Sequence, residues 1–237
     1  MAFPSSDTHL ISSYEEELTH LAASIAEMGG MVEAAITNAT KAVLKLDHVE
    51  AQATILADKQ IDAMQRKIDE TAVSMIARRQ PMAGDLRAII TSIHVANDLE
   101  RMGDMAKQIS RRSVQIEGLS LAPKFYNGLK HMNDLVLRQI KAALDAYATR
   151  DSAAAIEVCN SDDEIDALYT SLFRELLTYM MEDPRLITQC THLLFCGKSL
   201  ERAGDHATNI AEAAYYLDTG RQLSSQVEDL HRLQPKE

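Results

Sequence analysis

The strongest constraint on the fold of this 237-residue chain is an internal repeat of two acidic motifs. An Asp-x-x-x-Asp motif stands at 58–62 and recurs 104 residues later at 162–166. A Leu-Glu-Arg-x-Gly-Asp motif stands at 99–104 and recurs 101 residues later at 200–205. Because two motifs that recur in the same order at nearly the same spacing indicate a duplication, the fold should contain two similar units.

The residues between the repeated motifs predict long helices. Ala, Leu, Met, Glu, Lys and Gln dominate, which are strong helix formers, and only five prolines interrupt the chain. Apolar residues recur at steps of three and four, as in Leu18, Leu21 and Ile25, which is typical of an amphipathic helix. The sequence therefore predicts an all-α fold of six long helices, at about 12–46, 49–79, after Pro81 to 113, 124–149, 152–181 and 184–218.

The helices divide into two groups of three. Gly118 and Pro123 mark a connector between the groups, since glycine and proline punctuate helical chains. A first three-helix bundle is predicted at 8–118, a second at 119–220, and a polar tail at 221–237. Within the second bundle, Asp183 is a candidate cap for a helix that begins at Pro184.

Composition excludes several classes of protein. With 24 basic and 35 acidic residues the formal net charge is −11, which repels the phosphate backbone of nucleic acids. No run of about 18 apolar residues is free of charge, so no segment is predicted to cross a membrane, and the first residues do not resemble a secretion signal. Three irregularly spaced cysteines indicate a reducing cytosol. We expect a cytoplasmic protein that reaches the inner membrane only through partners.

The acidic residues of the repeat lie where a helix would normally place apolar residues. Glu100 and Asp104 are one turn apart and share a face. At 100° per residue, Ile93 lies within about 40° of Glu100, and the same arithmetic places Glu201 and Asp205 beside apolar positions. The acids of the other motif also align with isoleucines. Both motifs therefore put carboxylates in or beside the core-facing stripe.

The spacing around two prolines predicts that the acidic motifs of each repeat face one another. Pro81 lies 19 residues from both Asp62 and Glu100, and Pro184 lies 18 and 17 residues from its corresponding acids. Nearly equal arms around a hairpin bring the motifs to the same height. The expected groups are Asp58, Asp62, Glu100 and Asp104 in the first repeat, and Asp162, Asp166, Glu201 and Asp205 in the second.

Four carboxylates in a partly desolvated groove need positive charge, since burial and like charges disfavour ionisation. Arg101 and Arg202 directly follow the glutamates and are predicted to point away from them. A metal ion is the simplest compensation. Oxygen ligands favour Mg²⁺, Mn²⁺, Ca²⁺ or an iron ion over Zn²⁺, and four carboxylates allow bridged clusters. Asn209 and Gln108, one further turn along, extend the predicted ligand faces.

Alternative interpretations remain at this point. An isolated Glu-x-x-x-Asp motif is usually a solvated helix face, so a purely structural bundle is one alternative and a metal-dependent enzyme is another. Glu-x-x-His matches at 17–20 and 228–231 resemble an element that di-iron bundles use in pairs; since neither belongs to the repeat, a di-iron oxidase is a minor possibility. Arg78, Arg79 and Arg87 are either contacts for an acidic partner or solvated helix ends. The three cysteines are expected to pack as small hydrophobic residues.

Four segments together resemble the PhoU family of phosphate-signalling regulators. They are Arg-Gln-Pro-Met-Ala-Gly-Asp-Leu-Arg at 79–87, Asp-Leu-Glu-Arg-Met-Gly-Asp at 98–104, Glu-Leu-Leu-Thr-Tyr-Met-Met-Glu-Asp at 175–183 and Ser-Leu-Glu-Arg-Ala-Gly-Asp at 199–205. The resemblance extends from the first helix to about Gly220. The second half lacks the Arg-Gln-Pro and Asp-Leu-Arg pieces of the first.

The resemblance implies two fused three-helix bundles without catalytic activity, acting beside the high-affinity phosphate ABC transporter. Such proteins relay the state of the transporter to a sensor histidine kinase and restrain the two-component transcriptional response to phosphate starvation. The kinase and the transporter's ATPase subunit are the implied partners, and a homodimer is expected. The metal ligands carried over are Glu100, Asp104, Glu201 and Asp205, with Asp58, Asp62, Asp162 and Asp166 opposite them and Asn209 beside them; Gln108 replaces the asparagine in the first copy.

Overall fold

A computed structural model of the chain describes residues 6–116 and 124–223. Within these residues the regular structure is helical throughout and no strand is present, which confirms the predicted all-α class. None of the helices in this part is long and apolar enough to cross a membrane. The predicted boundary at 118–119 and most of the predicted tail at 221–237 lie outside the described residues.

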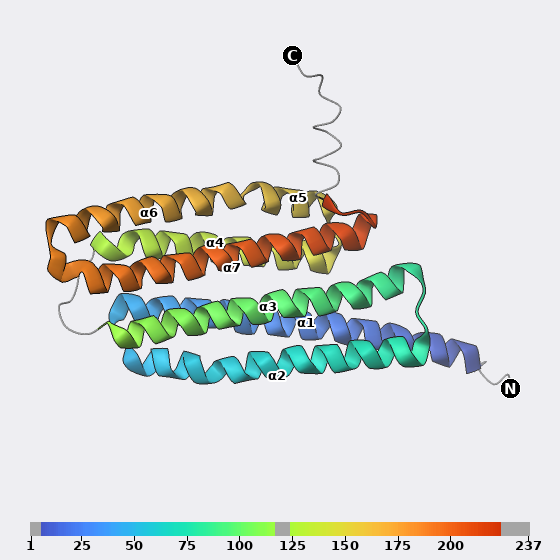
Figure 1. Ribbon diagram of the computed structural model, residues 1–237. Coiled ribbons are helices and arrows are strands. Elements are labelled where there is room, and N and C mark those ends of the chain that lie inside the picture. The colour runs from blue at the N-terminus through green and yellow to red at the C-terminus, as the bar shows by residue number, and fades with distance from the viewer. Residues whose placement is uncertain (1–5, 117–123, 224–237) are drawn as a thin grey trace, which may run out of the picture.

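Two helical bundles lie side by side (Figure 1). The first contains α1 (Ser6–Lys45), α2 (His48–Arg79) and α3 (Ala83–Gln115). The second contains α4 (Lys124–Thr149), α5 (Ser152–Asn160), α6 (Asp162–Glu182), a 3₁₀ turn η1 (Pro184–Leu186) and α7 (Ile187–Thr219). Because α5 and α6 follow one another along one side of the second bundle (Figure 1), each bundle has three helical arms, as the sequence predicts.

The helix predicted at 152–181 is interrupted at Ser161, which differs from the sequence prediction. Ser161 has φ −86° and ψ −7°, and its hydroxyl donates to the carbonyl of Val158 at 2.8 Å. Asn, Ser and Asp side chains compete with the backbone for hydrogen bonds, and here Asn160, Ser161 and Asp162 stand in a row. The predicted cap at the next turn is confirmed, since Asp183 Oδ1 accepts from the backbone N–H of Arg185 at 3.0 Å.

The two bundles also share the same turn before their second helix, α2 in the first bundle and α5 in the second. Asp47 Oδ1 accepts the N–H groups of the residues two and three positions later at 3.1 and 3.0 Å, and Asp151 does the same at 3.0 Å for both. The residues before them, Leu46 and Arg150, have positive φ angles of 52° and 54°. The two caps stand 104 residues apart, the same offset as the Asp-x-x-x-Asp motifs.

We expect Asp47→Ala and Asp151→Ala each to lower the free energy of unfolding by about 1 kcal/mol, because each leaves helix N–H groups without an acceptor. Urea unfolding followed by circular dichroism measures this. Glu157→Ala, at an exposed position within α5, serves as the control. If Asp47→Ala and Asp151→Ala lower the free energy of unfolding no more than the control does, the two caps contribute nothing to stability.

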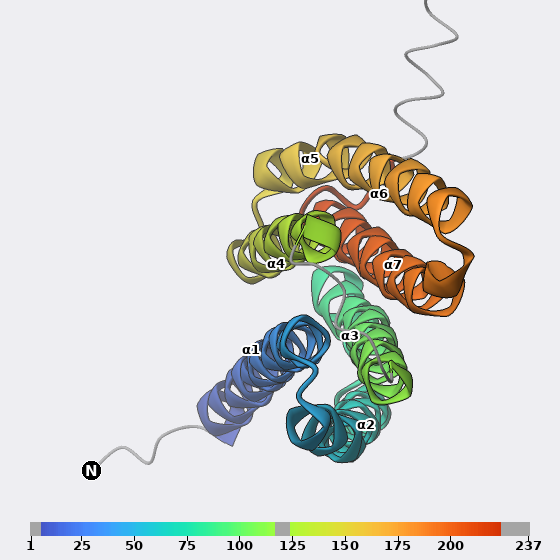
Figure 2. The same ribbon diagram turned by 90° about the vertical axis from the view of Figure 1, so that its left-hand side faces the viewer.

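The bundles meet through α3 and α7, which pack along each other in the centre of the molecule (Figure 2). Side chains pair across them in reverse chain order, so the two helices are antiparallel: Arg87 with Tyr216, Asp98 with His206, and Arg112 with Phe195. Ser92 Oγ and Tyr147 Oη, 2.9 Å apart, join α3 to α4. The opposite sides of α3 and α7 are thereby left to face α2 and α6.

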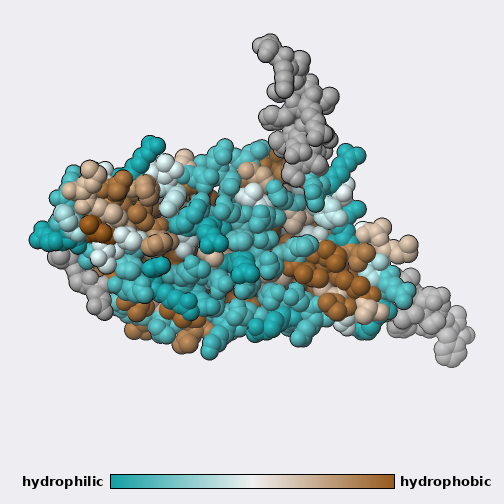
Figure 3. All heavy atoms as spheres, viewed as in Figure 1, coloured by the Kyte–Doolittle hydropathy of each residue, from teal (hydrophilic) through white to brown (hydrophobic). Residues whose placement is uncertain are grey.

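Two of the three cysteines lie in the interior, and the surface is mainly hydrophilic with a few apolar areas. Cys190 and Cys196 are fully buried, and burial raises the pKa of Cys196 to about 12, so the prediction that the cysteines pack as small hydrophobic residues is confirmed for these two, while Cys159 is half-buried. Figure 3 shows a mainly hydrophilic surface with apolar areas over the beginning of α3 and the end of α6. Exposed apolar residues in these regions include Met82, Leu86, Leu177 and Met181.

Candidate metal centres

The first acidic cluster lies between α2 and α3. Asp58, on α2, is only 4% exposed, and Lys107 of α3 reaches it. The ammonium Nζ lies 2.5 Å from Asp58 Oδ2 and 3.2 Å from Asp104 Oδ1. One lysine therefore touches carboxylates from both helices, so the motifs face one another at this point, as the spacing around Pro81 predicts.

The pKa of Glu100 also shows that acids of α2 and α3 lie close together. Burial raises the pKa of Glu100, and the negative charges of Asp104, Asp62 and Asp58 raise it further, while Arg101 opposes them. The other three acids of the first motif pair are thus all close enough to act on Glu100. Asp58 Oδ1 is buried and has no hydrogen-bond partner among the described residues, and such an atom is costly to leave unsatisfied. The cluster has an oxygen free to accept a cation.

The second acidic cluster lies between α6 and α7. Asp166, Glu201 and Asp205 each offer one carboxylate oxygen, and these oxygens lie within 4.8 Å of one another. Oxygen ligands of one hard cation lie about 2.0–2.6 Å from the ion, so they are at most twice that distance from one another. The separation of these three oxygens, within 4.8 Å, satisfies this condition. Burial raises the pKa of Asp205, and the charges of Glu201, Asp162 and Asp166 add to this effect. The residues present therefore fit a divalent ion.

Glu201 and Asp162 differ in how their charges are met. Lys198 forms an ion pair with Glu201 Oε1, while Glu201 Oε2 is buried and has no hydrogen-bond partner within 6–116 and 124–223. Asp162 Oδ1 instead accepts from Gln139 Nε2 of α4 at 3.1 Å. Each cluster thus contains one buried carboxylate oxygen without a hydrogen-bond partner among the described residues, Asp58 Oδ1 in the first and Glu201 Oε2 in the second.

Glycines in the repeated motif let the helices approach closely enough for the acids to meet. A Cβ atom on Gly103 would lie 3.0 Å from Ile61 and 3.6 Å from Asp58. At the equivalent Gly204 it would lie 3.1 Å from Ile165 and 3.7 Å from Asp162. The same pair of neighbours therefore surrounds each glycine.

Asn209 does not join the second cluster. Its Nδ2 donates to Asp98 Oδ1 at 3.2 Å across the contact between α3 and α7, beside His206 Nδ1 at 2.9 Å from the same oxygen. Two steps of four residues advance about 80° beyond whole turns, so Asn209 turns away from the face of Glu201. The prediction that it extends that face is wrong, and Gln108 likewise lines a cleft toward α7.

The counter-charges of the acids were not predicted correctly. Arg101 was expected to point away, but its Nε lies 3.5 Å from Glu100 Oε2, since a long side chain can bend back along its helix. Lys107 and Lys198 were not anticipated at all. The signal that could have identified them is spacing, because each stands three residues from an acid of the motif, a distance at which helix side chains are neighbours.

Residues near the ends of α1 and α2 serve the fold. Glu17 Oε1 lies 2.9 Å from Arg79 Nη2 and 3.6 Å from Arg78 Nη2, and the hydrogen bond from Arg79 lowers the pKa of Glu17. Arg87 lies over the Tyr216 ring at 5.4 Å. Glu17 is therefore engaged in an ion pair at the end of α2, and the second Glu-x-x-His match, 228–231, lies outside the described residues.

Comparisons with known proteins agree with the division of the chain into two similar bundles. The PhoU domain family model matches residues 25–113 and 129–214, once in each bundle. A phosphate-specific transport system accessory protein PhoU homolog from Rhizobium meliloti (strain 1021) is 50% identical over 217 residues, which cover 92% of each chain. A homolog of the same description from Caulobacter vibrioides (strain NA1000 / CB15N) is 44% identical over 218 residues, which cover 92% of this chain and 95% of that one.

Solved structures show the same fold. The crystal structure of PhoU from Pseudomonas aeruginosa matches with a TM-score of 0.83 and 41% identity, covering 88% of this chain and all of that one. The phosphate transport system regulatory protein PhoU from Streptococcus pneumoniae matches with a TM-score of 0.82 and 30% identity, covering 89% and 99%. With two matched domains, relatives of half-identical sequence and the same helical architecture, this chain belongs to the PhoU family.

Proposed function

We propose that this protein is a regulatory adaptor of phosphate homeostasis. It associates with the phosphate transport machinery in the cytoplasm and reports its state to a sensor histidine kinase, restraining the phosphate-starvation response. Relatives described as accessory proteins of the phosphate-specific transport system support the first part. The proposed partners are the ATPase subunit of the transporter, which would hold the protein at the inner membrane, the kinase, and a second copy of this chain.

The two acidic clusters carry the proposal, because carboxylates gathered twice at equivalent positions, with Asp58 buried in the first, have no role in packing alone. The proposed metal ligands are Asp58, Asp62, Glu100 and Asp104 at one site, and Asp162, Asp166, Glu201 and Asp205 at the other. A bound Mg²⁺, Mn²⁺ or iron ion would supply positive charge that fixes the facing helices. The unpaired Asp58 Oδ1 and Glu201 Oε2 support this assignment.

The chain's own residues perform the mechanical part of this function. Gly103 and Gly204 allow the close approach of the helices, and the lysines at each cluster hold the carboxylates in place until an ion competes for them. The two helices at each acidic cluster are thereby held rigidly together. Partners can then bind them without a further loss of conformational freedom in this protein. This role requires no chemical turnover.

The test is binding of the purified transporter ATPase subunit and of the kinase's cytoplasmic region in the presence of Mn²⁺. We expect the wild-type protein to bind at least one of them and the Glu100→Ala/Glu201→Ala variant to bind at least tenfold more weakly, because unfixed grooves must be ordered on binding. Glu157→Ala/Glu182→Ala, at two exposed positions, is the control. Turnover of a substrate that depends on Glu201 would instead favour a metal-dependent enzyme.

A further inference from the structure

A cleft of about 480 Å³ between α3 and α7 has a charge opposite to that of the protein. Arg111 and Arg112 of α3 and Lys198 and Arg202 of α7 line it, together with neutral polar residues such as Gln108 and Gln115. The described residues that line the cleft include no carboxylate. Four cations in one cleft of a chain with net charge −11 place a strongly positive potential where both repeats meet.

Three of these cations, Arg111, Arg112 and Arg202, have no counter-ion in the part of the chain that the structure describes. Lys198 pairs with Glu201, but the three arginines form no ion pair with a described residue. The repeat makes the difference clear, since Arg101, which occupies the position of Arg202 in the first copy, contacts Glu100 and Asp104. In the second copy, Arg202 lines the cleft instead.

Contacts within the protein already hold some of the side chains that line the cleft in position. The guanidinium of Arg112 lies 4.3 Å from the centre of the Phe195 ring, which holds its plane in position. Ser199 is 7% exposed, and its hydroxyl donates to the carbonyl of Phe195 at 3.0 Å. The charge of Arg112, added to burial, lowers the pKa of the nearby His192. Arginine is the side chain best suited to grip phosphate oxygens through two parallel hydrogen bonds.

The size of the cleft favours an anion larger than a single phosphate. Its volume falls within the range of about 300–1,000 Å³ that is usual for small-molecule sites. An orthophosphate ion has only five heavy atoms and would leave most of this volume unfilled. A compound with several phosphate groups would meet more of the cations at once.

We propose that the cleft between α3 and α7 binds a small anion with two or more phosphate groups, such as pyrophosphate or a nucleoside triphosphate. Arg111 and Arg202 contact the phosphates from opposite helices, and Arg112 contacts them from its position on Phe195. Because the contacts come from both repeats, the ligand ties one bundle to the other. This site goes beyond the adaptor function proposed above and does not require metal in the acidic clusters.

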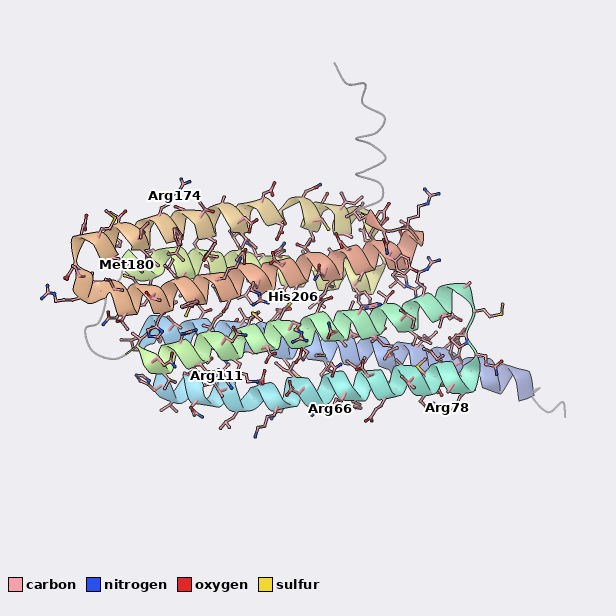
Figure 4. All side chains as sticks on the ribbon, viewed as in Figure 1. Arg66, Arg78, Arg111, Arg174, Met180 and His206 are labelled. Atoms are coloured by element: carbon pink, nitrogen blue, oxygen red, sulfur yellow. The ribbon has the colours of Figure 1, made fainter. Side chains whose placement is uncertain are left out.

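Isothermal titration calorimetry of the full chain at low salt, with EDTA present to remove metal, tests the proposal. The probes are pyrophosphate, ATP, orthophosphate and sulfate. The variant Arg111→Gln/Arg202→Gln removes two of the cations without counter-ions and leaves Arg112 in place on Phe195. Arg66→Gln/Arg174→Gln is the matched control, because it removes the same charge at exposed positions on α2 and α6, away from the cleft (Figure 4). Lys198 stays unchanged because it also contacts Glu201.

The expected result is saturable binding of one pyrophosphate or one ATP per chain, at least tenfold weaker in the cleft variant and unchanged in the control. Equal affinity for both probes would identify the phosphates as the recognised group, and tighter binding of ATP would identify a nucleotide. If the cleft variant does not fold, Arg111→Lys/Arg202→Lys keeps the charge and should still bind at least threefold more weakly, since lysine lacks the planar fork.

Three results would overturn the proposal. The first is the absence of saturable binding of either polyphosphate. The second is an equal loss of affinity in the cleft and control variants, which would reveal general attraction to charge. The third is sulfate or orthophosphate binding as tightly as pyrophosphate. If the cleft variant loses the transporter subunit while no polyphosphate binds, the cleft is a docking surface for an acidic protein segment and the proposed ligand is wrong.

Discussion

Lys107→Met is expected to destabilise the metal-free protein by about 1–3 kcal/mol, because it leaves a buried carboxylate without its counter-ion. Asp58 is 4% exposed, and Lys107 Nζ, 2.5 Å away, is the cation that compensates it. The lysine side chain itself is 22% exposed, so the cost should fall below that of a fully buried pair. Urea unfolding in EDTA measures the change.

Two further variants make this expectation specific. In Lys107→Met/Asp58→Asn the acid is neutral, so most of the lost stability should return. Lys198→Met should cost less than about 1 kcal/mol, because Lys198 is 47% exposed. If Lys107→Met is as stable as the wild type, the first cluster does not depend on an internal cation.

The lysines explain why the metal hypothesis could be formed from the sequence but its detail could not. Counting residues around Pro81 and Pro184 predicts that acids of two helices meet, because helix rise and hairpin symmetry fix their height. The direction of a long flexible side chain depends on its surroundings, and the sequence does not contain that information in a simple pattern. The direction of Arg101 and the part played by Lys107 therefore do not follow from the pattern, although the pattern places correctly the helix that carries them.

Other differences have equally local causes. The break at Ser161 separates α5 from α6, and overall helical periodicity hides a single residue that competes for backbone hydrogen bonds. Asn209 drifts around its helix because four residues exceed one turn. The pairing of Asp98 with His206 joins two repeats, and no pattern within one repeat can predict a contact between repeats. Local periodicity thus predicted the bundles, while their junction and the cleft there required the tertiary structure.

Adding Mn²⁺ or Mg²⁺ at 100 times its dissociation constant is expected to raise the free energy of unfolding by about 2.7 kcal/mol for each occupied site, because the ion binds the folded state alone. Glu201→Gln/Asp205→Asn should abolish the increment from the second cluster. Without metal the single variant Asp205→Asn, which keeps the Lys198–Glu201 ion pair, should be more stable than the wild type by about 0.2–0.5 kcal/mol, since it removes a repulsive pair one turn apart.

This reversal of sign between the metal-free and metal-bound proteins distinguishes an ion site from a merely acidic helix face. Glu212→Gln/Asp218→Asn is the matched control, because it makes the same chemical changes at exposed positions of α7, and it should leave the metal increment intact. Differential scanning calorimetry with and without EDTA measures both arms, and elemental analysis counts the ions. Equal stabilisation of the wild type and the cluster variant by metal would show that the ions bind elsewhere. If metal stabilises neither protein and none is found by elemental analysis, the acidic clusters belong to a purely structural bundle, in which lysines alone balance the carboxylates.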